Sequence, residues 1–305
     1  MMDVVVNGIR DDAPAGSKPL VSYGHYYLNF LSCLGCDPIY PPLADLLRLS
    51  HHLEGKWLIA SPIHWQATHN DAMVVATGKE LELTEDESRL WFAELTQFLK
   101  GDNFSPVYHD EQTWLFKIDT KPALKSKSVY TMLHQSMMPA LEAMDNTLFW
   151  QRLITELQMY LSSHSLNGQR QNKLAINGLW FWGSGEFKPS KNRKIVTDDE
   201  VLLANPGKLL EQINPLTPAS IMQKNDLLLL KYPQQMELAR IEENTKKLPL
   251  TGFGITWHIA SRRIIGGRDY GDNRLCVLNN ESYPTLYLFY PPVPLFYSVF
   301  MLLVE

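Results

Sequence analysis

The sequence predicts a mixed α/β or α+β protein, in which helices flank a mixed sheet with a central tryptophan-rich strand. Three observations support this fold class. Several segments repeat apolar residues at helical spacing, other short runs are rich in β-branched and aromatic residues, and residues 177–185 read NGLWFWGSG. A strand with large side chains on both faces has no solvent side, so we expect it to lie inside the protein.

The bulk properties are those of an ordinary globular protein. The chain has 305 residues, 45% of them hydrophobic and 20% charged. We expect a main α/β domain over 1–190 and a helical and strand extension over 191–305, which can belong to the same domain. The formal charge of -5 provides no basic surface for nucleic acid or for a membrane, and we expect neither partner. Three cysteines and an acidic start without signal-peptide features predict a cytoplasmic protein.

The first half of the chain is predicted to begin with a strand at 4–6, closed by an Asn-Gly turn. A helix follows over 41–53, with two prolines in its first turn. Residues 56–60 and 73–76 resemble two strands that flank a loop at 61–71.

A capping box opens the next predicted helix, because Thr84 precedes Glu87 by three residues and Trp91 and Leu95 follow on one face. Alternating residues over 107–118 then predict a hairpin.

The second half is predicted to begin with a helix over 146–162, capped by Asp145 or Asn146. The tryptophan strand follows. Beyond it we expect helices at 199–213 and 218–231 and a strand near 253–259.

The uncharged segment 285–304 is long enough to cross a bilayer. Pro291, Pro292 and Pro294 would interrupt a spanning helix, and aromatic residues fill its middle. A buried pair of strands is therefore favoured over a membrane anchor.

The glycine turn after the tryptophan strand is the main candidate for a binding site. Gly183 and Gly185 let the backbone turn sharply, and a strand followed by Gly-x-Gly can present amides to an anion. A tight turn beside buried tryptophans is the simpler interpretation, because the third glycine of a dinucleotide fingerprint is missing. If the turn binds a ligand, Asn177 and Trp182 lie at the two ends of that strand.

Several of these segments together resemble the bacterial RpfE-type regulatory protein family. The shared features are the helix 146–162, the NGQR sequence at 167–170, the NGLWFWGSG strand and the SPIHWQATHND sequence at 61–71. The resemblance covers about residues 43–185 and adds Arg170 and His64 to the candidate ligand-binding residues. Members are often labelled as similar to cofactor-independent phosphoglycerate mutase, which implies a distant link to the alkaline-phosphatase superfamily.

The phosphomutase chemistry implied by that label needs two divalent metals held by several Asp and His residues. Asn7 stands before Gly8, where an early strand of such an enzyme ends in an aspartate, and an amide is a weaker ligand for hard metals. A late Asp-His pair is missing from the sequence. The residues therefore predict neither a metal site nor a cofactor.

Other histidine and cysteine patterns give weaker signals. Cys33 and Cys36 form a Cys-x-x-Cys pair with His51 downstream, but the second half of a zinc site is absent, so reduced thiols are favoured. His64 and His69 are predicted to be turn or surface histidines without an orienting carboxylate.

We therefore expect a non-catalytic regulatory or ligand-binding protein whose partner is a small anionic ligand or another protein. Basic residues at 188–194, which follow the glycine turn, would favour an anion if the fold brings them over it. The alternative is a divergent metal-dependent phosphomutase or phosphatase.

Overall fold

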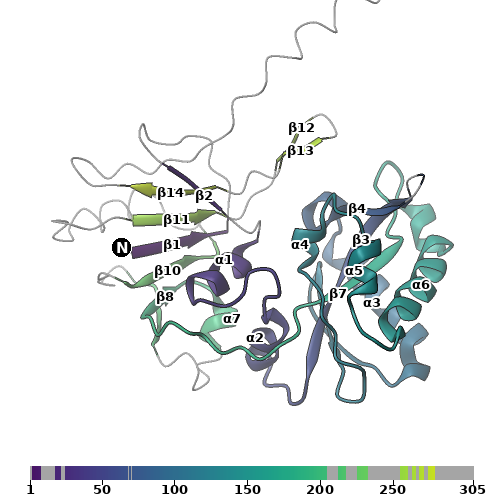
Figure 1. Ribbon diagram of the computed structural model, residues 1–305, viewed down its shortest axis with the longest axis horizontal. Coiled ribbons are helices and arrows are strands. Elements are labelled where there is room, and N and C mark those ends of the chain that lie inside the picture. Colours follow the sequence, from purple (N-terminus) through teal and green to yellow (C-terminus); the bar gives the residue numbers. More distant parts are fainter. Residues whose placement is uncertain are drawn as a thin grey trace, which may run out of the picture.

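The structure is a computed structural model that describes residues 2–7, 18–21, 25–67, 69, 71–204, 212–217, 225–232, 255–259, 263–265, 268–270 and 274–278. Two sheets lie in separate halves of the molecule, and helices flank them (Figure 1). Parallel and antiparallel strands both occur, which confirms the predicted mixed α/β class.

The first sheet has seven strands within the described residues, in the order β2-β14-β11-β1-β10-β8-β9. Their bounds are β1 Met2–Val6, β2 Lys18–Val21, β8 Ile195–Thr197, β9 Ile213–Pro215, β10 Leu227–Leu230, β11 Ile255–Ile259 and β14 Arg274–Leu278. Strand β1 pairs in parallel with β10 and β11, whereas β14 is antiparallel to both β11 and β2. Strands from 1–190 and from 191–305 therefore form one sheet.

Continuous apolar runs explain the parallel centre of this sheet. The valines of β1 and the four leucines of β10 are buried, as expected where both faces of a parallel sheet are covered. The predicted helix at 218–231 is wrong over Leu227–Leu230, which is a strand. A short run of leucines fits a buried helix or a buried strand equally well, and here pairing with β1 and β8 decided the outcome.

The second sheet contains five strands of the described chain. Their bounds are β3 Trp57–Ala67, β4 Ala72–Thr77, β5 Ser105–Asp110, β6 Thr113–Lys117 and β7 Gly178–Trp182. Strand β3 pairs with β4, β6 and β7. The predicted loop at 61–71 is wrong as far as Ala67, because β3 continues through Pro62, whose carbonyl accepts a hydrogen bond from the Thr77 hydroxyl.

The tryptophan strand β7 is buried over all five residues, as predicted. On one face, the Phe181 ring lies 5.3 Å from that of Trp150 in α6. On the other, the Trp182 ring lies 6.0 Å from that of Tyr130 in α4. Among the described strands, β7 pairs with β3. Helices α6 and α4 pack against β7 and bury its two faces.

The α-helices are α1 Tyr26–Cys33, α2 Leu43–Ser50, α3 Glu85–Phe98, α4 Val129–Met132, α5 Met138–Glu142, α6 Phe149–Ser162 and α7 Glu200–Leu203. Short 3-10 helices span Gly78–Leu81, Leu99–Asp102 and Ser165–Gln169, and β12 Arg263–Ile265 pairs with β13 Arg268–Tyr270. The predicted helices at 41–53 and 146–162 are confirmed as α2 and α6. The N-cap of α6 is Leu148 and not the predicted Asp145 or Asn146, although the Asp145 carboxylate, three positions earlier, accepts the Trp150 amide at 3.0 Å.

The predicted helix at 199–213 is confirmed only in its first turn, which is α7. Ile213 belongs to β9, and 205–211 lie outside the described residues, as does the uncharged segment 285–304. Over the part of the chain that the structure describes, no helix is both long enough and apolar enough to span a bilayer.

Candidate functional site

Polar residues follow three neighbouring parallel strands of the first sheet. Asn7 comes after β1, Asp198 and Asp199 come after β8, and Lys231 comes after β10. The carboxyl ends of parallel strands meet at one edge, so these residues converge although they are far apart in sequence. The arrowhead of β1 shows that this edge faces the half that contains the second sheet (Figure 1).

Backbone and side-chain contacts fix these residues against one another. Asp198 accepts hydrogen bonds from the amides of Lys231, at 2.6 Å, and Tyr232, at 3.1 Å. The side-chain amide of Asn7 donates a hydrogen bond to the Lys231 carbonyl oxygen at 3.4 Å. Asp199 is fully buried, and its Oδ1 accepts the Val201 amide and the Lys231 ammonium, both at 3.0 Å.

Two tyrosines from the start of α1 complete this group. The Lys231 ammonium also donates to the Tyr27 hydroxyl at 3.2 Å. Burial and the Asp199 carboxylate raise the pKa of the Tyr26 and Tyr27 hydroxyls, so both stay protonated. We call this group the carboxyl-edge cluster; its members are Asn7, Tyr26, Tyr27, Asp198, Asp199 and Lys231.

Three histidines lie beside the cluster. The ring of His25 stacks on Tyr130 with centroids 4.5 Å apart, and burial lowers its pKa from 6.5 to about 4. His51 Nε2 and His109 Nδ1 are 2.8 Å apart, so one shared proton joins them. Burial also lowers the pKa of both, although Asp110, with its Oδ2 3.7 Å from His109 Nε2, partly opposes this at His109. All three are therefore neutral near neutral pH.

Three solvent-shielded polar atoms in this region have no hydrogen-bond partner among the residues that the structure describes. They are Asp199 Oδ2, the Tyr26 hydroxyl oxygen and His25 Nδ1. Buried polar groups in native proteins are nearly always hydrogen-bonded, and exceptions occur where a ligand, water or ion binds. These three atoms are enclosed by the protein itself, whereas Asn7, Asp198 and Lys231 are partly exposed and can contact a ligand at this edge.

The sequence-predicted residues occupy other positions, in and around the second sheet. Asn177 bridges the backbone of Trp65, accepting its amide and donating to its carbonyl, both at 2.8 Å. His64 Nδ1 lies 2.8 Å from the Ala175 carbonyl oxygen. These two residues thus lie together at the amino end of β7.

Trp182, Gly183 and Gly185 lie at the opposite end of β7. The Trp182 indole donates to the Ser61 hydroxyl at 3.0 Å, and the Gly183 carbonyl accepts the Ala44 amide at 3.1 Å. Gly183 has φ +82°, and a Cβ there would lie 3.2 Å from the Ala44 nitrogen, so the turn requires glycine. The structure therefore gives this turn a role in joining β7 to α2.

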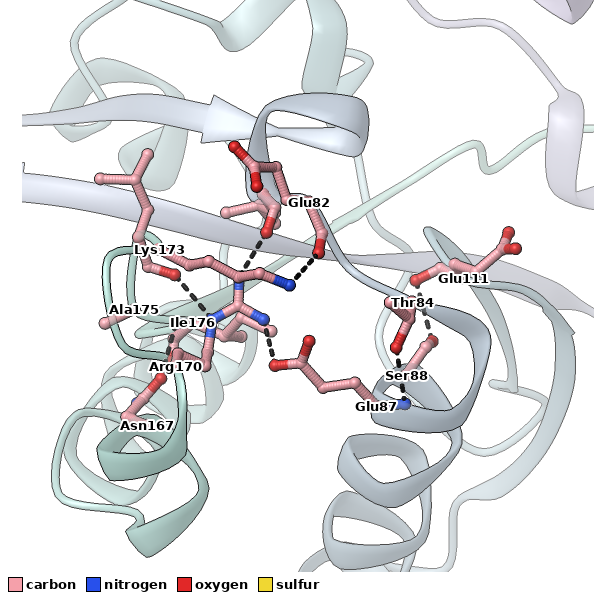
Figure 2. A network of polar contacts seen from close by, with 12 residues as sticks. Glu82, Thr84, Glu87, Ser88, Glu111, Asn167, Arg170, Lys173, Ala175 and Ile176 are labelled. Carbon is pink, nitrogen blue, oxygen red and sulfur yellow. Dashed lines mark hydrogen bonds and ion pairs between the residues drawn. The ribbon is translucent and has the colours of Figure 1, made fainter.

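Arg170 is nearly buried in a third location, between α3 and the segment that leads into β7 (Figure 2). Its guanidinium donates to the Glu87 carboxylate and to the carbonyls of Leu81 and Leu174. Glu87 donates its amide to the Thr84 hydroxyl, as the predicted capping box requires, but its carboxylate accepts from Arg170, so only this half of the box forms. The network ties the two segments together.

Replacing Glu87 with Gln is expected to lower the free energy of unfolding by about 2 kcal/mol, because a hydrogen bond to a buried charged group is weakened. Glu85→Gln is the matched control on the same helix. Its partner Arg89 is exposed, so the loss of this ion pair should leave stability nearly unchanged. Urea unfolding of both variants measures the difference. Equal losses would contradict a structural role for the Arg170 ion pair.

The cysteine pair lies apart from the histidines. Cys33 is buried at the end of α1, and burial raises the pKa of its thiol well above the usual range. Cys36 is partly exposed, and burial raises the pKa of its thiol as well. Within the described residues, no group of three or more His, Cys, Asp or Glu side chains is arranged to hold a metal ion.

Sequence reasoning missed the carboxyl-edge cluster, although a signal for it was present. Three apolar runs, VVV, IVT and LLLL, each end directly at polar residues, which are Asn7, Asp198 with Asp199, and Lys231. The sequence predicts Asp199 as a helix start, and it does cap α7. The second role of Asp199 is missed because the sequence predicts no strand at 195–197 and a helix over 227–230, where the structure has β8 and β10.

Comparison with known proteins adds little to this geometry. No family model and no curated protein matches the chain. A solved structure, the cofactor-independent phosphoglycerate mutase from Thermoplasma acidophilum, aligns over 93% of this chain and 90% of its own, with 14% identity and a TM-score of 0.35. Similarity at this level assigns neither a family nor an activity to this chain.

Proposed function

We propose that this protein binds a small polar molecule at the carboxyl-edge cluster. The observation that carries the proposal is the convergence of Asn7, Asp198 and Lys231, which come from three different strands, contact one another and are all partly exposed. Polar side chains that meet in this way and still reach solvent can contact a ligand together. Regulation through that ligand is the role we favour.

The topology supports this location independently. In open α/β sheets, ligands bind beyond the carboxyl ends of the strands. Strands β1, β10 and β8 are neighbours and run parallel, so their carboxyl ends form one such edge. Asn7 and Lys231 follow β1 and β10 at this point.

A ligand screen by thermal unfolding tests the proposal. Sugars, amino acids, amines, nucleotides and phosphate esters are compared on the wild type, on Asp199→Asn and on Asp119→Asn as an exposed control. A ligand present at about 100 times its Kd should stabilise the wild type and the control by about 2.7 kcal/mol, and Asp199→Asn much less. If no compound stabilises the wild type, or if all three proteins respond equally, the proposal is wrong.

A divergent phosphomutase is the competing function, and the RpfE-type resemblance stays a hypothesis beside it. The Asp199 carboxylate is neutralised by Lys231, which supports ligand binding over two-metal chemistry. We therefore expect no conversion of 3-phosphoglycerate to 2-phosphoglycerate with added Mn²⁺ or Mg²⁺, and no tightly bound pair of metals.

Metal analysis after gentle purification and a coupled mutase assay check this expectation. Asn7→Asp restores the carboxylate expected at the end of the first strand and serves as the comparison. Wild-type turnover that a chelator abolishes, or two equivalents of bound Mn or Zn, would establish the enzymatic alternative.

A further inference from the structure

Three histidines connect the two halves of the molecule. His25 is the N-cap residue of α1, which packs on the first sheet, and its ring stacks on Tyr130 of α4 in the second half (Figure 1). His51 is the C-cap residue of α2, and its Nε2 lies 2.8 Å from Nδ1 of His109 in β5. We call His25, His51 and His109 the junction histidines.

Both contacts require neutral rings. The hydrogen bond between His51 and His109 needs one unprotonated nitrogen as its acceptor. If both rings are protonated, two N–H groups and two positive charges face each other across that short distance, and the contact becomes repulsive. In the other contact, Nδ1 of His25 is buried without a hydrogen-bond partner among the described residues, so an N–H on that nitrogen finds no acceptor there.

The surroundings of the junction histidines also favour the neutral form. The groups that act on the rings are the carboxylates Asp110 and Asp199, which favour protonation, and Lys79, Lys231, His52 and the neighbouring junction histidines, which oppose it. Burial has the largest influence on each ring and outweighs the carboxylates, so the pKa of His25 is about 4 and the pKa values of the other two lie below 6.5. By linkage, the closed junction is favoured above about pH 6.5 and weakened as the pH falls.

Other contacts across the junction do not titrate. Helix α2 packs on β3 through buried apolar side chains. The Ala44 amide donates to the Gly183 carbonyl at 3.1 Å, and the Ser128 amide donates to the Ile39 carbonyl at 3.3 Å. These contacts keep the halves attached in acid, so loss of the histidine contacts loosens the junction without unfolding either sheet.

We propose that the junction histidines form a pH-sensitive latch, which holds the two halves together near neutral pH and releases them on acidification. This latch goes beyond the proposed function and does not depend on a ligand. Tyr26 and Tyr27 of the carboxyl-edge cluster follow His25 directly in α1, so release also uncovers that cluster.

Hydroxyl-radical footprinting tests the latch, because it measures how exposed each side chain is at a chosen pH. Tyr27 is 6% exposed and its ring lies 5.9 Å from that of His25, so it reports on the junction. Its modification should rise about tenfold between about pH 7.5 and about pH 5.5, since His25 takes up a proton in that range only when it is exposed. Met159, at 65% exposure, corrects for the pH dependence of the reagent. Trp180 and Trp182 should stay unmodified, because the second sheet remains folded.

A triple variant, His25→Phe with His51→Gln and His109→Asn, removes the titration and keeps the contacts. The Gln amide replaces Nε2 of His51 and the Asn amide replaces Nδ1 of His109, so the pair can form its hydrogen bond at any pH. Modification of Tyr27 in this variant should not change with pH. His69→Gln, at an exposed position, is the control and should follow the wild type.

If the triple variant does not fold, His25→Phe alone keeps the proposal testable, because it should remove most of the rise in Tyr27 modification. The latch is disproved if Tyr27 modification in the wild type stays constant on acidification, or if it rises equally in the variants. A parallel rise at Trp180 and Trp182 would show global unfolding and would also overturn the proposal.

Discussion

Replacing Trp180 or Trp182 with Ala is expected to lower the free energy of unfolding by about 3–5 kcal/mol for each variant. Both side chains are almost fully buried, at 0% and 1% exposure. Each substitution leaves a cavity and also removes an indole hydrogen bond, to the Lys127 carbonyl for Trp180 and to the Ser61 hydroxyl for Trp182. In Trp182→Ala, the buried Ser61 hydroxyl loses the indole that donates to it, and this lowers the free energy of unfolding further.

Equilibrium unfolding in urea measures both effects. Trp182→Phe keeps a ring in the site and should lose much less than Trp182→Ala. Met159→Ala removes a side chain that is 65% exposed and should change stability by less than about 0.5 kcal/mol. Losses below about 1 kcal/mol in both alanine variants would contradict the buried position of β7.

Acidification is expected to destabilise the protein through His25. Its pKa is about 4 when folded and 6.5 as the ordinary value, so the unfolded chain binds the proton more tightly. The neutral His25 ring therefore makes its full contribution to the free energy of unfolding above about pH 6.5. That contribution, about 3 kcal/mol, is lost as the pH falls toward about 4. His51 and His109 act in the same direction.

The groups that face His25 set the size of this effect. Asp110 favours the protonated ring, whereas Lys79, His109 and Lys231 oppose it, and burial outweighs them all. His25→Phe retains a ring against Tyr130 but cannot titrate, so its unfolding free energy should fall less steeply over the same pH range. His69→Gln, at an exposed position, is the control and should follow the wild type. Parallel curves for wild type and His25→Phe would disprove the effect.

Local patterns were enough to predict several elements of the fold. The capping residues before α3, the apolar face of α6 and the bulky residues of β7 all act on near neighbours in sequence, so their signals survive without knowledge of distant contacts. Because bulky side chains lie on both faces of β7, the sequence also predicted correctly that Trp180 and Trp182 are buried.

Strand identity was harder to predict in both sheets. The leucines of β10 have no period, and only their parallel pairing with β1 and β8 makes them a strand. Pro62 in β3 gave a loop signal, yet pairing with β7 continues on both sides of it. In each case tertiary pairing outweighed the local preference.

The sequence by itself determined the tryptophan-rich core and the helices around it, because burial of large side chains follows from composition and spacing. The tertiary structure alone decided where polar groups meet. Asn7 and Lys231 are 224 positions apart, and Asp199 contacts Lys231 across 32 positions. Such contacts depend on which strands run parallel and in what order, and no local pattern encodes that order.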